Sequence, residues 1–147
     1  MENLIEVQIV EAVRGLLVGR VNEILNNWQN LIPLFEFSHF HGMTAVVPTI
    51  ALNSCERSEK ERIIQIDAYS LTVSLSVPET PESELYCYGY SAAVDKAIKE
   101  NPTLGGVVDR AVINGKKFIP PKRANCGQDW ELIISLRITA EVTDYVS

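Results

Sequence analysis

The stretch YSLTVSLSV, residues 69–77, decides which class of fold the chain adopts. Apolar and hydroxyl side chains alternate along it, so Tyr69 and the four aliphatic residues share one face of an extended chain, while the serines and the threonine share the other. Strict alternation over this length is typical of a β-strand with one apolar face. The sequence therefore predicts a long strand that buries one side.

Upstream of Tyr69 the apolar positions change parity. Ile64 and Ile66 fall on the opposite face, so the buried face of the strand predicted over residues 62–77 would change partway along. Two explanations stay open: a β-bulge, or a strand whose first half leaves the sheet and pairs with a neighbouring subunit as an arm. The preceding segment ERSEKER, residues 56–62, carries six charges in seven residues and predicts a solvated hairpin tip.

A long amphipathic helix is predicted before the strand, over residues 2 to about 27. Its apolar residues recur in steps of three and four, interrupted by Arg14: Val7, Val10, Leu17, Val21, Ile24, Trp28 and Leu31. The helix should end before Pro33, which disfavours helical backbone at the residue before it. Gly15 and Gly19 lie one turn apart, and they either admit the close approach of another backbone or are simply tolerated.

A second helix is predicted over about residues 80–100. Thr80 provides an N-cap, Pro81 suits the first helical position, and Lys96 and Lys99 lie near the C-terminal end, where the helix dipole favours cations. Tyrosines follow one another at alternate positions in its first half, at Tyr86, Tyr88 and Tyr90.

The glycine pair after this helix raises two interpretations, a phosphate-binding loop or a structural corner. A phosphate loop needs a helix N-terminus behind the glycines, but here Asn101-Pro102 ends a helix and Gly105-Gly106 follow it. The C-terminal end of a helix carries the negative end of the dipole and repels phosphate. We therefore expect a corner at residues 101–106 that leads into a strand starting at Val107.

Three further segments predict strands: residues 43–53, where Pro48 indicates a sheet edge or a bulge, residues 107–114, and residues 130–142. Residues 115–128 carry two prolines, two glycines and four basic residues and predict a protruding loop. The order helix, strand, strand, helix, strand, strand lacks alternating strand and helix units. It predicts a single α+β domain over residues 1–147, with a mainly antiparallel sheet packed against the two helices.

Composition excludes some classes of function. The net charge is −6, from 13 basic and 19 acidic residues, which disfavours the broad basic surface that nonspecific nucleic-acid binding requires. No apolar run is long enough to span a membrane. Three cysteines, Cys55, Cys87 and Cys126, form no CxxC pair, and no signal peptide is recognisable, which favours a reducing cytosol.

Candidate chemical groups are few. His39 and His41 could both ligate a metal from one side of an extended segment, but no partner motif accompanies them, and an aromatic loop explains them as well. Cys126 follows a cationic stretch that could lower its thiol pKa, yet no histidine lies near it in sequence. The sequence therefore assigns no catalytic residue, no metal ligand and no cofactor.

Three pieces of sequence together resemble a known family. They are the Pro48-Thr49-Ile50 strand, the corner at residues 103–108 with its sequence TLGGVV, and the final strand that begins at Trp130. Arranged behind a long amphipathic helix, they resemble the tail terminator, or tail completion, proteins of long-tailed bacteriophages and prophages, over roughly residues 1–142. These motifs are structural, so the resemblance supplies no catalytic residues.

The resemblance implies a small structural α+β subunit, not an enzyme, that forms a ring, commonly a hexamer, on the head-proximal end of the tail tube. The ring would stop tube polymerisation and offer a surface to the head connector, and it would be assembled in the host cytoplasm and kept in the tail of the virion. Its partners would be further copies of itself, the tail tube protein and connector proteins. DNA would pass through the lumen without specific binding, and net acidity would tend to make that lumen negative.

Six residues are candidates for the contacts that such a ring needs. Four belong to the basic segment and two to the strand whose parity changes: Lys116, Lys117, Lys122, Arg123, Ile64 and Ile66. A solvated loop explains the basic segment equally well. The alternative functions are a small ligand-binding or enzymatic α+β domain, with a cleft between the sheet and the tyrosine-bearing helix, or another head–tail joining or tail tube component.

Overall fold

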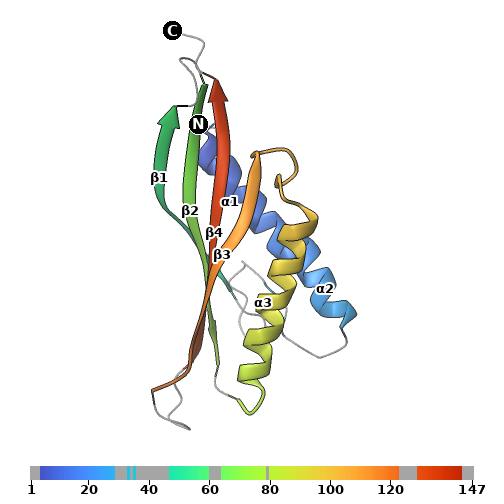
Figure 1. Cartoon of the computed structure of the whole chain (residues 1–147). Coiled ribbons are helices and arrows are strands. Elements are labelled where there is room, and N and C mark those ends of the chain that lie inside the picture. The colour runs from blue at the N-terminus through green and yellow to red at the C-terminus, as the bar shows by residue number, and fades with distance from the viewer. Residues whose placement is uncertain are drawn as a thin grey trace.

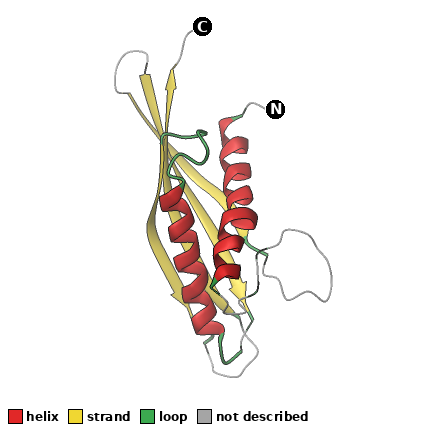
Figure 2. Ribbon diagram, turned by 90° about the vertical axis from the view of Figure 1, so that its right-hand side faces the viewer, coloured by secondary structure: helices red, strands yellow, loops and turns green. Residues whose placement is uncertain are grey.

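The computed structural model of the protein describes residues 4–28, 33, 35, 47–59, 64–78, 80–122 and 129–143. Its helical elements are α1 (Ile5–Leu16), a π-helical turn η1 (Leu17–Val21), α2 (Asn22–Asn27) and α3 (Ser83–Glu100). Its strands are β1 (Thr49–Glu59), β2 (Ile64–Val77), β3 (Arg110–Ile119) and β4 (Trp130–Thr143). The predicted α+β class is confirmed: the helices lie together on one face of one long sheet (Figures 1 and 2).

The sheet is antiparallel throughout, in the order β1-β2-β4-β3, so β1 and β3 are its edge strands. β2 and β4 pair without interruption from Ile64 opposite Thr143 to Val77 opposite Trp130. Each edge strand contains one register shift, between Leu52 and Ser54 in β1 and at residues 113–115 in β3. The prediction of an edge strand near Pro48 is confirmed for β1, but the strand extends to Glu59, so the prediction of a hairpin tip was wrong for residues 56–59.

The parity change in β2 has a different cause from either predicted one. The strand has no bulge, and it stays paired with β4 over its full length. Ile64 and Ile66 face outward, while Asp67 occupies the inner-face position two residues before Tyr69. Asp67 is 1% exposed, so a buried carboxylate takes the place of an apolar side chain.

The core lies between the inner face of the sheet and the helices. The apolar face predicted from residues 69–77 is confirmed, since all five of its residues are at most 2% exposed. β4 contributes Leu132, Ile134, Leu136 and Ile138 to the same layer, and each of them is also almost fully buried. Burial of aliphatic side chains at about 25 cal/mol per Å² makes this layer the main source of stability.

The predicted first helix exists, but its buried row was wrong before residue 17. Val7 is 44% exposed, and Ile9 and Val13 fill the core instead. Within α1 the buried row steps back from Leu17 by four residues at a time, to Val13 and then Ile9. The predicted row instead alternates steps of three and four through Arg14, Val10 and Val7, and so lies one position or more away from the buried one.

The second helix begins at Ser83, later than predicted, and its N-cap position is Glu82, which makes no side-chain capping hydrogen bond, whereas the sequence predicts Thr80 as the N-cap. Thr80 and Ser83 close the turn before the helix. The Thr80 hydroxyl accepts a hydrogen bond from the Glu82 amide at 3.2 Å, and the Ser83 hydroxyl accepts one from the Thr80 amide at 2.6 Å. Ser83 also donates to the Pro78 carbonyl at 2.5 Å. These contacts satisfy backbone groups that a helix start leaves unpaired.

The corner after α3 is confirmed, and its backbone is left-handed over three residues. Leu104, Gly105 and Gly106 have φ of 51°, 74° and 92°. Glycine adopts such angles readily, whereas Leu104 does so although it is nearly buried. The prediction that the strand starts at Val107 was wrong, because β3 starts at Arg110, and β3 also continues to Ile119, through part of the segment predicted as a loop.

Candidate interface surfaces

The basic segment does not form one surface. Lys116 and Lys117 are neighbours in β3, so they point to opposite faces of the sheet. Lys116 lies on the inner face, with its Nζ 3.5 Å from Asp95 Oδ2 on α3, whereas Lys117 lies on the outer face and is exposed. Lys122 is exposed just beyond the strand, and Arg123 lies outside the described residues. The predicted loop was therefore wrong for residues 115–119, since it treated two opposite faces as one.

Ile64 and Ile66 lie on a part of the sheet that has only three strands. β3 starts opposite Thr139, so residues 140–143 of β4 pair with β2 alone, and β2 pairs there with residues 57–59 of β1. We call residues 57–59, 64–67 and 140–143 the three-stranded extension. It reaches beyond the helices in both views (Figures 1 and 2), and both isoleucines are half-buried on its outer face.

An ion pair fixes the base of the three-stranded extension. Arg57 of β1 lies directly opposite Asp67 of β2, and its Nε and Nη2 donate to the two carboxylate oxygens at 2.7 and 2.9 Å. Hydrogen bonds from this guanidinium hold the pKa of the Asp67 carboxyl below its usual range, against the opposing effect of burial. Sequence reasoning missed the pair, because it depends on the register between two strands joined by residues 60–63.

The outer face of the sheet is lined by small hydroxyl side chains. No helix in the described ranges covers it, since α1, α2 and α3 all pack on the inner face (Figure 2). Its central strands present Ser70, Thr72, Ser74, Ser76, Ser135 and Thr139. The charged residues of this face that the structure describes are Glu56, Glu131, Glu141, Arg110, Arg137 and Lys117. The face is therefore hydrophilic and close to neutral.

The three predicted tyrosines do not line a common cleft. Tyr90 is fully buried, its hydroxyl donates to the Pro33 carbonyl at 2.5 Å, and its ring stacks on Phe35 at 4.9 Å. Burial raises the pKa of the Tyr90 phenol. Tyr86 is half-buried against the core, and only Tyr88 is exposed, with its ring edge-on to Phe118 at 5.2 Å.

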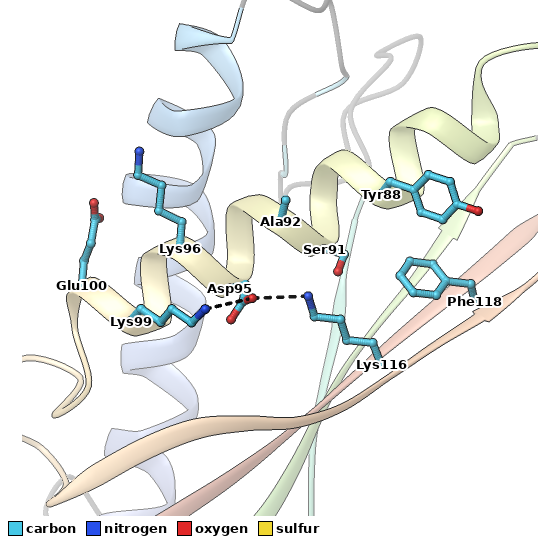
Figure 3. Close-up of a pocket in the computed structure, with 9 residues that line it drawn as sticks. All are labelled: Tyr88, Ser91, Ala92, Asp95, Lys96, Lys99, Glu100, Lys116 and Phe118. Atoms are coloured by element: carbon cyan, nitrogen blue, oxygen red, sulfur yellow. Dashed lines mark hydrogen bonds and ion pairs between the residues drawn. The ribbon is translucent and has the colours of Figure 1, made fainter.

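A groove does exist between α3 and β3, and it runs along α3 from Tyr88 to Glu100. It has a volume of about 650 Å³, and Figure 3 shows Ser91, Asp95 and Lys99 of α3 on the side facing Lys116 and Phe118 of β3. The Asp95 carboxylate lies 3.5 Å from both Lys99 Nζ and Lys116 Nζ. Lys96 and Glu100 point away from Lys116, toward the rim.

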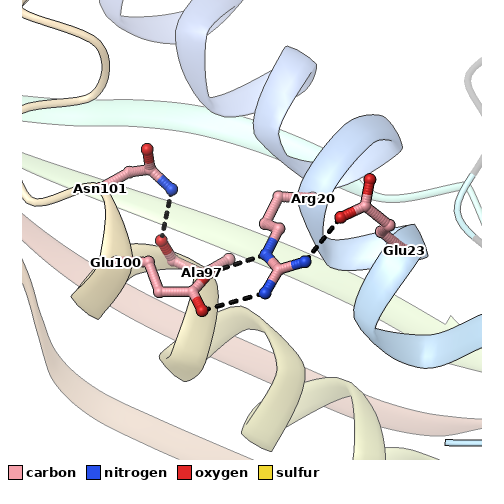
Figure 4. Close-up of polar contacts among 5 residues, drawn as sticks. All are labelled: Arg20, Glu23, Ala97, Glu100 and Asn101. Carbon is pink, nitrogen blue, oxygen red and sulfur yellow. Dashed lines mark hydrogen bonds and ion pairs between the residues drawn. The ribbon is translucent and has the colours of Figure 1, made fainter. Parts of the chain in front are cut away.

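Polar contacts join the first helical segment to α3 and to Phe35. The Arg20 guanidinium on η1 donates to both carboxylate oxygens of Glu100 at 2.7 and 3.0 Å, and to Glu23 (Figure 4). This contact lowers the pKa of the Glu100 carboxyl. The Asn22 amide holds the Phe35 backbone in two places: its Oδ1 accepts from the Phe35 amide at 2.7 Å, and its Nδ2 donates to the Phe35 carbonyl at 2.8 Å.

The remaining sequence candidates carry no chemistry in the described chain. The amides of Leu104, Gly106 and Val108 bond to the corner itself, so they are not free to bind phosphate. A Cβ added at Gly15 or Gly19 would meet nothing within 4 Å among the described residues, so none of their backbone approaches these glycines closely. Burial raises the pKa of the Cys87 thiol to about 11, while Cys55 is exposed. His39, His41 and Cys126 lie outside the described residues.

Comparison with known proteins adds no relationship. No protein family model matches the chain, and no curated protein sequence matches it. Among the residues that the structure describes, no group of three or more histidine, cysteine, aspartate or glutamate side chains could hold a metal ion. None of the helices in these ranges is long and apolar enough to cross a membrane.

Proposed function

We propose that the protein is a structural subunit of a bacteriophage or prophage tail. Copies of it form a ring, a hexamer, on the head-proximal end of the tail tube, where the ring stops tube polymerisation and provides the docking surface for the head connector. The protein is assembled in the bacterial cytoplasm and remains in the virion tail. This proposal combines the resemblance in the sequence with one structural observation, the three-stranded extension.

The extension supports a ring because its strand ends project beyond the helices of its own subunit, where another copy can contact them. Its β1 and β4 strands reach past the start of β3, and Ile64 and Ile66 keep apolar surface half-exposed there. A contact between this extension and a different surface of the next copy is heterologous, and heterologous contacts generate rings when the rotation closes. The Arg57–Asp67 pair would keep the extension rigid enough to set that rotation.

The outer face supports a role beside a channel. Small hydroxyl side chains on the central strands give a smooth hydrophilic surface, and its acidic and basic residues nearly balance. A ring that turned this face inward would offer DNA a hydrophilic lining whose exposed arginine, lysine and glutamate side chains nearly balance in charge. Such a lumen would be nearly neutral, whereas the sequence predicts a negative one.

The alternative of a small ligand-binding domain rests on the groove between α3 and β3, since a groove of about 650 Å³ falls within the range of small-molecule pockets. Light scattering after size-exclusion chromatography, together with negative-stain microscopy, separates the two functions. Rings of uniform diameter support the tail subunit. A protein that stays monomeric at every concentration and in the presence of tail tube protein, and that a small molecule stabilises in a thermal shift assay, supports the alternative.

A further inference from the structure

The groove between α3 and the edge strand β3 is longer than the part that Tyr88 and Phe118 line. A second cavity of about 610 Å³ adjoins it, shares Asp95 and Lys99 with it, and extends to Arg110. We propose that this whole groove binds an extended acidic segment of a partner protein, which adds a strand to the free edge of β3. The inference goes beyond the proposed ring, whose contacts use the three-stranded extension and not this groove.

The charge of the groove favours an anionic occupant. Lys99 and Lys116 line its walls, and Lys96 and Arg110 lie at its rim, in a chain whose net charge is −6. Its carboxylates are already engaged by the protein, because Glu100 accepts two hydrogen bonds from Arg20 and Asp109 accepts one from the Glu141 amide. Asp95 is shared by two ammonium groups, each at 3.5 Å.

These lysines are available to a ligand. The Lys99 side chain is 76% exposed, and its contact with Asp95 is long for an ion pair. In the described part of the chain, no carboxylate lies within ion-pair distance of Lys96 or Arg110. Carboxylates of an incoming segment would therefore gain partners without first breaking a strong internal contact.

The other end of the groove is apolar. Tyr88 is 47% exposed and meets Phe118 edge-on, and Leu85, one turn earlier on α3, is 60% exposed. Exposed aromatic and aliphatic side chains beside a cationic surface fit a segment that carries both acidic and apolar residues.

The spacing along β3 favours an extended segment over a helix. Lys116 and Phe118 lie two residues apart on the inner face, which is about 7 Å along a strand. An added strand places its own alternate side chains at the same spacing, so an acidic residue two positions from an apolar one would meet this pair. β3 is an edge strand, and its outer edge offers the backbone hydrogen bonds that strand addition uses.

Fluorescence anisotropy on the full chain tests the inference. The probe is a fluorescein-labelled peptide of eight residues in which aspartate and leucine or phenylalanine stand two positions apart on one face, with threonine at the positions between them, and its matched control has asparagine in place of aspartate. We expect the acidic peptide to bind and the control to bind at least about tenfold more weakly. Absence of binding by the acidic peptide, or equal binding of the two peptides, would overturn the inference.

Two variants with the same charge change locate the binding surface. Lys99→Glu should weaken binding at least about tenfold, whereas Lys117→Glu, on the outer face, should change it less than about threefold. Circular dichroism confirms that both variants are folded. Equal effects of the two variants on peptide binding would show nonspecific charge attraction and would contradict the proposed groove. The proposal would also be contradicted if the protein bound no peptide but self-associated, and Lys99→Glu abolished that self-association.

Two backbone-modified peptides test strand addition itself. Each carries N-methyl groups on alternate residues, in complementary positions, so each has one edge unable to donate hydrogen bonds. Strand addition uses one edge of the peptide, so one of the two should lose binding while the other keeps it. If both bind as well as the unmodified peptide, the segment does not extend the sheet.

Discussion

The Asp67 carboxylate accepts two hydrogen bonds from the Arg57 guanidinium across two neighbouring strands, with the acid 1% exposed and the base 58% exposed at its side chain. The two partners are therefore not equivalent. Removing the base leaves a buried charge without a counter-ion, whereas neutralising the acid leaves a solvated cation. Arg57→Leu should consequently lower the free energy of unfolding several-fold more than Asp67→Asn at pH 7, as measured by urea denaturation.

The dependence of stability on pH should also change sign at this pair. In the natural chain the pKa of Asp67 lies below its unfolded value, so its contribution is present above that unfolded pKa and is lost as pH falls through the folded pKa. In Arg57→Leu, burial without a counter-ion would raise the pKa of Asp67 above the unfolded value, so its contribution would fall as pH rises. The measurement is the free energy of unfolding as a function of pH, for Arg57→Leu and for the double variant that adds Asp67→Asn. If both variants kept the pH dependence of the natural chain, this role of the pair would be contradicted.

Asn22 should be important beyond its place in a helix. Asn22→Ala removes both hydrogen bonds to the Phe35 backbone, and Phe35 is buried, so we expect a loss of about 1–3 kcal/mol in the free energy of unfolding. Asn26→Ala is the matched control, because Asn26 is exposed on the same helix α2. It should change stability by less than about 0.5 kcal/mol. Equal losses in the two variants would mean that the Phe35 contact contributes little.

Substitution by alanine should have opposite effects on the stability of the subunit at Gly106 and at Gly15. Gly106→Ala should destabilise the subunit by about 1 kcal/mol, because φ of 92° strains any residue with a Cβ. Gly15→Ala should stabilise it by about 0.5–1 kcal/mol, because the added Cβ meets nothing and alanine favours the helix. If Gly15→Ala were more stable but no longer formed rings, the backbone that approaches Gly15 closely would belong to a neighbouring subunit. Thermal unfolding together with light scattering separates these effects.

Ile66 tests the role of the three-stranded extension. Ile66→Ser should prevent ring assembly and leave the subunit folded, since Ile66 faces outward and is only half-buried. Ile133→Ser is the matched control, because Ile133 is also a half-buried isoleucine on the outer face but lies opposite Ser74 in the middle of the sheet. It should leave assembly intact. If both variants assemble normally, the extension is not the contact.

The fold was largely predictable because its signals are local. Alternation over residues 69–77 and the break at Asn101-Pro102 each depend on a few consecutive residues. The errors arose where an element departs from a constant period. The buried row of the first helix steps by four residues from Ile9 to Leu17 instead of alternating three and four, and the register shift before Gly115 hid the continuation of β3. No local pattern reveals an inserted residue of this kind.

The candidate surfaces were harder to predict, because each combines distant segments. Lys116 and Asp95 meet only when β3 packs under α3, and Arg57 meets Asp67 only in one hairpin register. One usable signal was present: Asp67 stands at the parity of Tyr69 and Leu71, so the inner face would bury it and require a cation on the neighbouring strand. The change of parity at Ile66 marks the point where this acid replaces an apolar residue on the inner face.

The most direct test of the proposed function uses the tail tube protein encoded in the same genome. Cryo-electron microscopy would compare tubes assembled by that protein alone with tubes assembled in the presence of this chain. We predict that the chain forms a ring on one end of each tube and that tubes stop growing once it is bound. Tubes that keep growing, with both ends free of added density at saturating concentrations of the chain, would contradict the proposal.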